Sequence, residues 1–131
     1  MTPHAGDQVV HRGGCHCGAV RFQAKGSNVV TAMRCNCSIC KMKQNHHFMV
    51  PEADFQLLQG EDKLTLYQFN TKEAKHLFCS MCGVQSFYRP RSDPDCYAVT
   101  VQCIDDGSIK EAHIEDVDGQ NWEQWQRERR A

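Results

Sequence analysis

The sequence predicts a mainly β fold: one domain of two packed sheets, or a barrel, with a short C-terminal helix. Two observations carry this prediction. Short segments that alternate apolar and polar residues recur along the chain with turn-forming residues between them, which is typical of half-buried strands. In addition, nine of the 131 residues are cysteine, and most of them lie in short clusters. Clustered cysteines in an odd number favour metal binding over a complete set of disulfides.

The strands follow from these alternating segments. Residues 19–24 (Ala-Val-Arg-Phe-Gln-Ala) and 64–69 (Leu-Thr-Leu-Tyr-Gln-Phe) show the clearest alternation. Further strands are expected at 29–33, 48–50, 55–58, 84–88 and 97–101. Glycine, asparagine and proline residues separate these segments and mark the turns between them.

Helix is expected in two places. Residues 38–43 suit a helical turn, and the one regular helix is expected to start at Asn121, a good N-cap followed three residues later by Gln124. Trp122 and Trp125 share one face of that helix, which we expect to dock on the sheet. No linker or repeat divides the chain, so we expect an N-terminal extension at 1–10 and a single domain at 11–131.

Composition argues against several classes of protein. Fifteen basic and sixteen acidic residues give a formal net charge of −1, whereas a dedicated nucleic-acid binder is usually basic. No apolar run approaches the ~20 residues that span a bilayer, and the N-terminal residues do not resemble a secretory signal. We therefore expect a cytoplasmic protein, with the nucleus as the alternative. In such a reducing compartment, clustered cysteines are more often metal ligands than disulfides.

Seven of the cysteines form three clusters: Cys15 and Cys17 (CxC), Cys35, Cys37 and Cys40 (CxCxxC), and Cys79 and Cys82 (CxxC). Structural zinc sites have four protein ligands in a tetrahedron, whereas catalytic zinc sites keep one position open. The triplet lies within six residues and can converge on one ion whose fourth position stays open. The other four cysteines then form a structural site. A nearby histidine that completes the second site is the alternative, and Cys96 and Cys103 are expected to be packing residues.

These motifs resemble the glutathione-dependent formaldehyde-activating enzyme family. The similarity lies in residues 13–22, 35–40 and 78–88, and residues 44–51 and 88–92 are closer to its centromere protein V branch. The resemblance covers the chain from about residue 11 to the C-terminal helix. It implies a β-tent fold of stacked antiparallel sheets and two zinc ions. It also implies the same division of ligands: a structural zinc on Cys15, Cys17, Cys79 and Cys82, and a second zinc on Cys35, Cys37 and Cys40.

The ligand set suggests the chemistry. A zinc ion with three thiolates has a formal charge of −1 and is a poor Lewis acid for hydrolysis, but it is well suited to holding a fourth thiolate. The resemblance implies that glutathione adds to formaldehyde to give S-hydroxymethylglutathione, and that the reverse reaction cleaves a carbon–sulfur bond. The sequence-based hypothesis is a zinc-dependent carbon–sulfur lyase that acts on a small thiol adduct. Cys35, Cys37 and Cys40 form its open metal site.

Other polar residues near the triplet are candidates for binding and proton transfer. Glutathione is anionic, and the basic residues beside the cysteine motifs are Arg34, Lys41, Lys43, Arg89 and Arg91, although any one of them taken alone is more simply a surface charge. His46 and His47 follow the triplet and are candidate ligands or acid–base groups. His47 is preferred because it resembles a histidine of the centromere-protein branch. His16 is expected to point away from the zinc of its neighbours.

A second hypothesis is a non-enzymatic module of the centromere protein V type, in which both zinc ions are structural and the domain binds protein or chromatin. Chromatin binding usually draws on a long basic segment, and this sequence contains none. A zinc ribbon that binds nucleic acid is a third hypothesis. The near-neutral charge gives it little electrostatic support.

Overall fold

The structure, a computed structural model, describes residues 6–36, 38–44, 46–68, 75–90 and 95–117. In these residues the chain forms two sheets. The three-stranded sheet has the order β1 (Gln8–Gly14), β2 (Arg21–Ser27), β5 (Phe55–Gln59). The seven-stranded sheet has the order β10 (Glu111–Val117), β3 (Val29–Cys35), β4 (His46–Pro51), β9 (Cys96–Thr100), β8 (Phe87–Arg89), β7 (Lys75–Cys79), β6 (Leu64–Tyr67). The mainly β prediction is confirmed.

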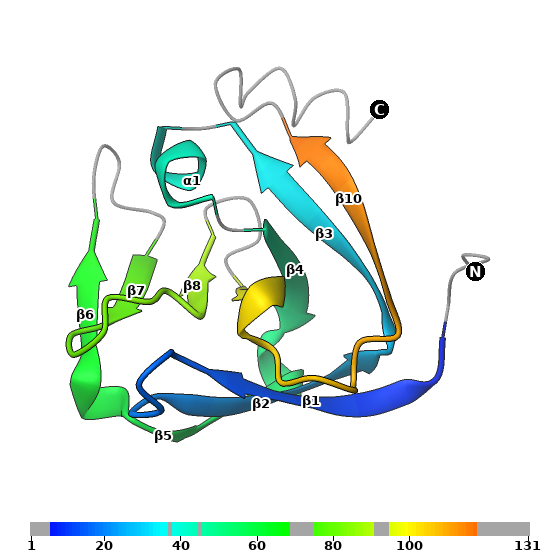
Figure 1. Cartoon of the computed structure of the whole chain (residues 1–131), viewed down its shortest axis with the longest axis horizontal. Coiled ribbons are helices and arrows are strands. Elements are labelled where there is room, and N and C mark those ends of the chain that lie inside the picture. The colour runs from blue at the N-terminus through cyan, green and yellow to red at the C-terminus, as the bar shows by residue number, and fades with distance from the viewer. Residues whose placement is uncertain (1–5, 37, 45, 69–74, 91–94, 118–131) are drawn as a thin grey trace.

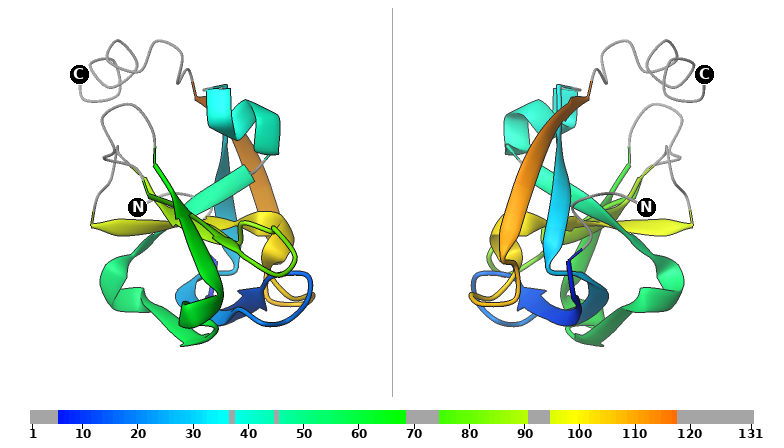
Figure 2. Two further views of the ribbon diagram at one scale, coloured as in Figure 1. Left: turned by 90° about the vertical axis from the view of Figure 1, so that its left-hand side faces the viewer. Right: turned by 90° about the vertical axis from the view of Figure 1, so that its right-hand side faces the viewer.

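The larger sheet stands over the smaller one (Figure 1). The short helix α1 (Ser38–Lys43) lies at the end of the large sheet that is farther from the small sheet, as both views of Figure 2 also show. Three 3-10 turns connect strands: η1 (Glu52–Asp54), η2 (Glu61–Lys63) and η3 (Val101–Cys103). In the part of the chain that is described, no helix has the length and apolar character needed to cross a membrane.

All seven predicted strands are present, and two of them differ in their boundaries for local reasons. The strand expected at 19–24 begins only at Arg21, because the Val20 carbonyl accepts a hydrogen bond from the Cys15 amide in a turn. The strand expected at 84–88 is shortened to Phe87–Arg89, because the Val84 carbonyl likewise accepts from the Cys79 amide. Both differences arise where the chain turns around a cysteine motif.

Sequence patterns did not predict β1, β7 or β10. The folded region begins before residue 11, since Gln8 already pairs with Ser27. Glu115 and Asp116 are charged like the residues of a solvated loop, yet they belong to β10, which pairs in parallel with β3. A parallel pair requires a long crossover connection, so its residues carry no hairpin signal. The expected C-terminal helix, with Asn121, Trp122, Gln124 and Trp125, lies outside the described residues.

Aromatic side chains fill the space between the two sheets. Phe22 of the small sheet is fully buried and stacks on Phe55, with the ring centroids 5.3 Å apart. Phe55 also stacks on Tyr97 of the large sheet at 4.1 Å, and Phe87 contacts all three rings. Burial of such rings is the main apolar contribution to stability in a domain of this size.

A buried histidine ties β1 to two other segments. His11 is fully buried; one ring nitrogen, Nε2, lies 2.8 Å from the Ser27 carbonyl oxygen and the other, Nδ1, lies 2.7 Å from the Ser108 hydroxyl. A carbonyl only accepts, so Nε2–H donates to it and Nδ1 accepts from the Ser108 hydroxyl. Both polar atoms of this ring are therefore satisfied inside the core.

We expect His11→Leu to lower the free energy of unfolding by about 3 kcal/mol, because it leaves the Ser27 carbonyl and the Ser108 hydroxyl without their partner. Urea unfolding followed by circular dichroism measures this change. The exposed Lys25→Leu on β2 is the control and is expected to shift stability by less than about 0.5 kcal/mol. Equal stability of the two variants would contradict this role for His11.

Candidate metal centre

The first cysteine motif forms a tight turn between β1 and β2. The Cys15 amide donates to the Val20 carbonyl at 3.1 Å, and the Gly18 amide donates to the Cys15 carbonyl at 3.2 Å. The Val20 amide also donates a hydrogen bond to the Cys15 sulfur at 3.3 Å. Gly18 has φ +81°, a conformation that favours glycine. The turn thereby supplies a backbone N–H to one sulfur and presents Cys15 and Cys17 together.

The CxxC motif between β7 and β8 repeats this arrangement. The Cys79 amide donates to the Val84 carbonyl at 3.1 Å, and the Gly83 amide donates to the Cys79 carbonyl at 2.8 Å. The Met81 amide lies 3.4 Å from the Cys79 sulfur. Gly83 has φ +78°, as expected for the glycine that follows a metal-binding turn. The two turns therefore have the same design, although they come from different sheets.

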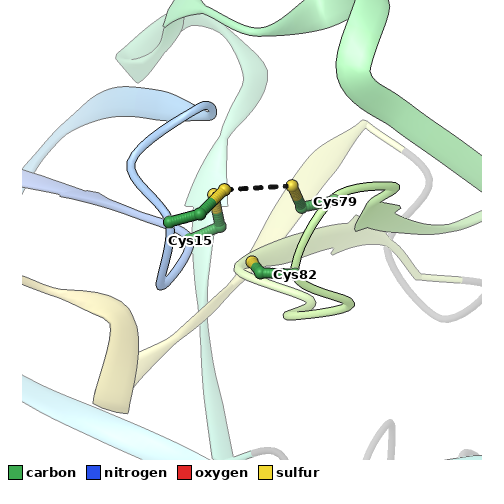
Figure 3. A group of neighbouring side chains, drawn as sticks. Cys15, Cys79 and Cys82 are labelled. Atoms are coloured by element: carbon green, nitrogen blue, oxygen red, sulfur yellow. Dashed lines mark hydrogen bonds between the residues drawn. The ribbon is translucent and has the colours of Figure 1, made fainter.

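The two turns face each other and bring four thiols together. Figure 3 shows Cys15, Cys79 and Cys82 pointing toward one another. The sulfurs of Cys15 and Cys17 are 3.6 Å apart, those of Cys17 and Cys79 are 3.7 Å apart, and all four sulfurs lie within 4.8 Å of one another. A tetrahedral zinc site with bonds of about 2.3 Å places its sulfurs about 3.8 Å apart. The donor set therefore fits one zinc ion, and the predicted grouping of these four cysteines is present.

Electrostatics also favour a cation at this point. Amide N–H groups of Cys17 and Val84 donate to the Cys82 sulfur and, with its thiol neighbours, lower the pKa of Cys82 to about 6. At Cys17 the Ala19 amide also lowers the pKa, but burial and the neighbouring thiols outweigh this effect and raise the pKa to about 11. Four sulfurs this close cannot all be ionised without a compensating positive charge. A divalent metal supplies that charge.

Cys103 lies near this cluster but outside the four-thiol group. Burial raises its pKa to about 11, and negative charge on Cys15 and Cys82 adds to the effect. A half-buried thiol that stays protonated is consistent with the expected packing role of Cys103. Cys96 is also half-buried. The exposed His16 lies in the turn, as expected for a residue that points away from the metal.

The second cysteine motif is described in part. Cys35 is half-buried at the end of β3, and Cys40 is 7% exposed within α1. Cys37 lies outside the described residues. Among the described residues, the four-thiol group is the one whose donor atoms lie close enough together for a metal. The second site thus remains a prediction from sequence.

A buried polar cluster that the sequence did not predict lies beside Cys40. The Tyr88 hydroxyl is 3.9 Å from the Cys40 sulfur and 3.2 Å from Nε2 of His47. His76 stacks on the Tyr88 ring, and the Gln85 amide lies 3.3 Å from His76 Nδ1. A hairpin centred on the CxxC turn places residue 76 opposite residue 88. The contact between His76 and Tyr88 could therefore have been predicted from the sequence by centring a hairpin on this motif. His46 instead contacts Gln102, with 3.0 Å between Nδ1 and Nε2.

The candidate basic residues have different partners in the structure. Arg34 pairs with Asp116, with 2.6 Å between Nε and Oδ1. Arg89 pairs with Glu52 at 3.5 Å and lies over the Tyr97 ring. Lys43 instead lies with Nζ 5.1 Å from the centre of the Phe78 ring. Burial lowers the pKa of Lys43, and negative charge on Cys40 opposes that effect. Lys41 is exposed, and Arg91 lies outside the described residues.

Comparison with known proteins adds an independent observation. A family model described as glutathione-dependent formaldehyde-activating enzyme matches residues 10–124, which is most of the chain. The chain belongs to this family. The match includes all three cysteine clusters and the hairpin that carries Tyr88. It does not favour the alternative of a non-enzymatic binding module.

Two known proteins are similar to this chain, one in sequence and one in both sequence and structure. A curated protein of Halomonas elongata, provisionally named a glutathione-dependent formaldehyde-activating enzyme, is 32% identical over 79 residues, which cover 54% of this chain and 50% of that protein. The chain thus aligns with about half the length of this relative. The crystal structure of a Rhodobacter sphaeroides protein has a TM-score of 0.68 and 32% identity, covering 79% of this chain and 99% of the other.

We expect Cys79→Ser to lose the metal of the four-thiol group and to unfold, because binding of a structural zinc contributes about 10–16 kcal/mol to folding in comparable small sites. Metal analysis and circular dichroism of the purified variant measure both effects. Cys103→Ser is the matched control, since it removes a nearby thiol that lies outside the group. A Cys79→Ser protein with unchanged metal content and melting temperature would contradict the assignment.

Proposed function

We propose that this family member is a zinc-dependent enzyme that forms or cleaves the carbon–sulfur bond between a small thiol and formaldehyde. S-Hydroxymethylglutathione is the candidate adduct. The observation that carries the proposal is the division of the cysteines. Four thiols converge in a closed group that does not include Cys35 or Cys40 of the remaining triplet, and Cys40 lies beside a buried polar cluster. Membership of the family supports the substrate class.

The closed group leaves no position for a substrate, because four cysteines complete a tetrahedral zinc ion. We therefore assign the chemistry to a second zinc on Cys35, Cys37 and Cys40. Held by three thiolates, that ion would supply an open position in which a substrate thiol loses its proton and is held. The protein's own residues must then bind the rest of the substrate and handle the proton.

The bond changes define what those residues do. In the forward direction the thiolate sulfur attacks the formaldehyde carbon, a carbon–sulfur bond forms, the carbon–oxygen π bond breaks, and the oxygen takes a proton. The reverse reaction returns that proton and releases the thiolate and formaldehyde. His47 is the candidate acid–base group. It is 3% exposed, and its Nε2 lies 3.2 Å from the Tyr88 hydroxyl, which in turn lies 3.9 Å from the Cys40 sulfur.

Lys43 is the candidate group for a substrate carboxylate. It lies in the same short helix as Cys40, and burial lowers its pKa. Arg34 and Arg89 already pair with Asp116 and Glu52, whereas Lys43 takes part in no ion pair among the described residues. A partly desolvated ammonium group without an acidic partner gains more from a bound carboxylate than a fully solvated one does.

We expect Lys43→Gln to raise KM for glutathione about 10-fold with a smaller change in kcat, because it removes a charge-assisted contact worth about 1.5 kcal/mol. Steady-state kinetics with glutathione and formaldehyde measure this. Lys41→Gln in the same helix is the matched control. 2-Mercaptoethanol, which has no carboxylate, should show no difference between Lys43→Gln and wild type. A similar loss with both thiols would contradict a carboxylate contact.

The activity itself is tested by exchange NMR. We expect the wild-type protein to accelerate exchange among glutathione, formaldehyde and their adduct above the spontaneous rate. Cys37→Ser should lose one of two zinc ions and this acceleration while staying folded, since the closed group is intact. Wild type without acceleration would overturn the proposed function and return the non-enzymatic binding module as the better hypothesis.

A further inference from the structure

Tyr88 joins two groups to which the proposed mechanism assigns different roles. Its hydroxyl lies 3.9 Å from the Cys40 sulfur and 3.2 Å from Nε2 of His47. Cys40, His47 and Tyr88 are each 7% exposed or less. Burial of polar side chains destabilises a core unless they are hydrogen-bonded, and here the Tyr88 hydroxyl and Nε2 of His47 are within hydrogen-bond distance of each other.

Neighbouring side chains fix the direction of the Tyr88 hydroxyl. The His76 ring stacks on the Tyr88 ring with centroids 4.9 Å apart and planes 17° apart, and the His47 ring approaches edge-on at 5.2 Å. The Gln85 amide lies 3.3 Å from Nδ1 of His76, so it holds His76 in turn. His76 and Gln85 are also buried. The phenol is thus confined on two sides, which is the feature expected of a group that positions another.

The chemistry of the sulfur sets the direction of the hydrogen bonds. A cysteine that ligates a metal is a thiolate, which can only accept a hydrogen bond. The Tyr88 O–H then donates to Cys40, and its oxygen is left to accept from Nε2–H of His47. The order of donation runs from His47 through Tyr88 to the metal-bound sulfur. This order of donation places a proton on Nε2 of the His47 ring.

We propose that Tyr88 is a positioning residue for the second metal site, which donates a hydrogen bond to the Cys40 thiolate and receives one from His47. This inference rests on the second metal site of the proposed function. Three thiolates around a divalent cation leave a net charge of −1, and a donated hydrogen bond stabilises that charge on the sulfur. Partners of this kind around metal ligands typically change metal affinity by about 10- to 100-fold.

The test compares wild type, Tyr88→Phe and Tyr97→Phe, each as the full chain with cobalt(II) in place of zinc. Tyr97 is the control, because its ring also packs in an aromatic cluster but lies against Phe55 and Phe87. Competition with a chelator measures the affinity of each cobalt ion, and the near-ultraviolet thiolate-to-cobalt band reports on the sulfur directly.

We expect Tyr88→Phe to hold the second cobalt ion about 10-fold more weakly or worse. Its thiolate-to-cobalt band should move to lower energy, because the sulfur lone pairs lose a hydrogen bond that stabilised them. The four-thiol group and the Tyr97→Phe protein should be unchanged. The Tyr97→Phe protein separates this effect from a general change in aromatic packing.

The contrary outcomes are distinct. If wild type binds two cobalt ions and Tyr88→Phe matches it in affinity and spectrum, the role of Tyr88 is overturned while the proposed function stands. If wild type binds only one cobalt ion, the second site fails, and both proposals fall with it. Should Tyr88→Phe not fold, a second pair of variants decides. His47→Leu removes the donor to Tyr88 and should shift the band, whereas His47→Gln keeps an N–H at that position and should restore it.

Discussion

The convergence of four thiols is the constraint on which the rest of the structure depends. Cys15 and Cys17 belong to the turn between two strands of the small sheet, and Cys79 and Cys82 belong to a hairpin of the large sheet. The group therefore brings the two sheets together across the 62 residues that separate Cys17 from Cys79, and one metal ion bound to it would tie them. A structural zinc contributes about 10–16 kcal/mol, which is as much as the whole net stability of an ordinary domain, about 5–15 kcal/mol.

The same constraint also places the polar cluster near Cys40. The CxxC turn closes the hairpin of β7 and β8, and its geometry sets the register in which His76 lies opposite Tyr88. Directly opposed residues of an antiparallel pair project from the same face of a sheet, which brings these two rings into contact. Tyr88 in turn lies opposite Ala98 on β9, the strand that pairs with β4 and His47. The four-thiol group and the cluster are thus linked, because the turn that supplies Cys79 and Cys82 also sets the strand register of the cluster.

This linkage explains what the sequence could and could not predict. The four metal ligands were predictable because each pair lies within one tight turn, and the spacing within a turn is a local property. The surroundings of Cys40 were harder to predict, because the local hairpin brings only His76 to Tyr88. His47 lies near them through β9, which pairs with both β4 and β8 and is distant from β4 in the chain. The parallel strand β10 was missed for a similar reason: its charged residues look like a solvated loop until β3 is placed beside it. The sequence alone shows the residues of each cysteine turn, whereas pairing between strands determines which side chains surround Cys40.

The two cysteine sets have opposite physical requirements. A closed site needs four strong donors and a rigid frame, and the paired turns with their glycines and amide donors to sulfur meet both needs. A site that accepts a substrate thiol needs an incomplete ligand set whose extra negative charge is balanced by neighbours. Two histidines, a tyrosine and a glutamine buried together would weaken an ordinary core, and large apolar residues would serve packing better at those positions. Their position next to Cys40 is the pattern expected when buried polarity serves chemistry.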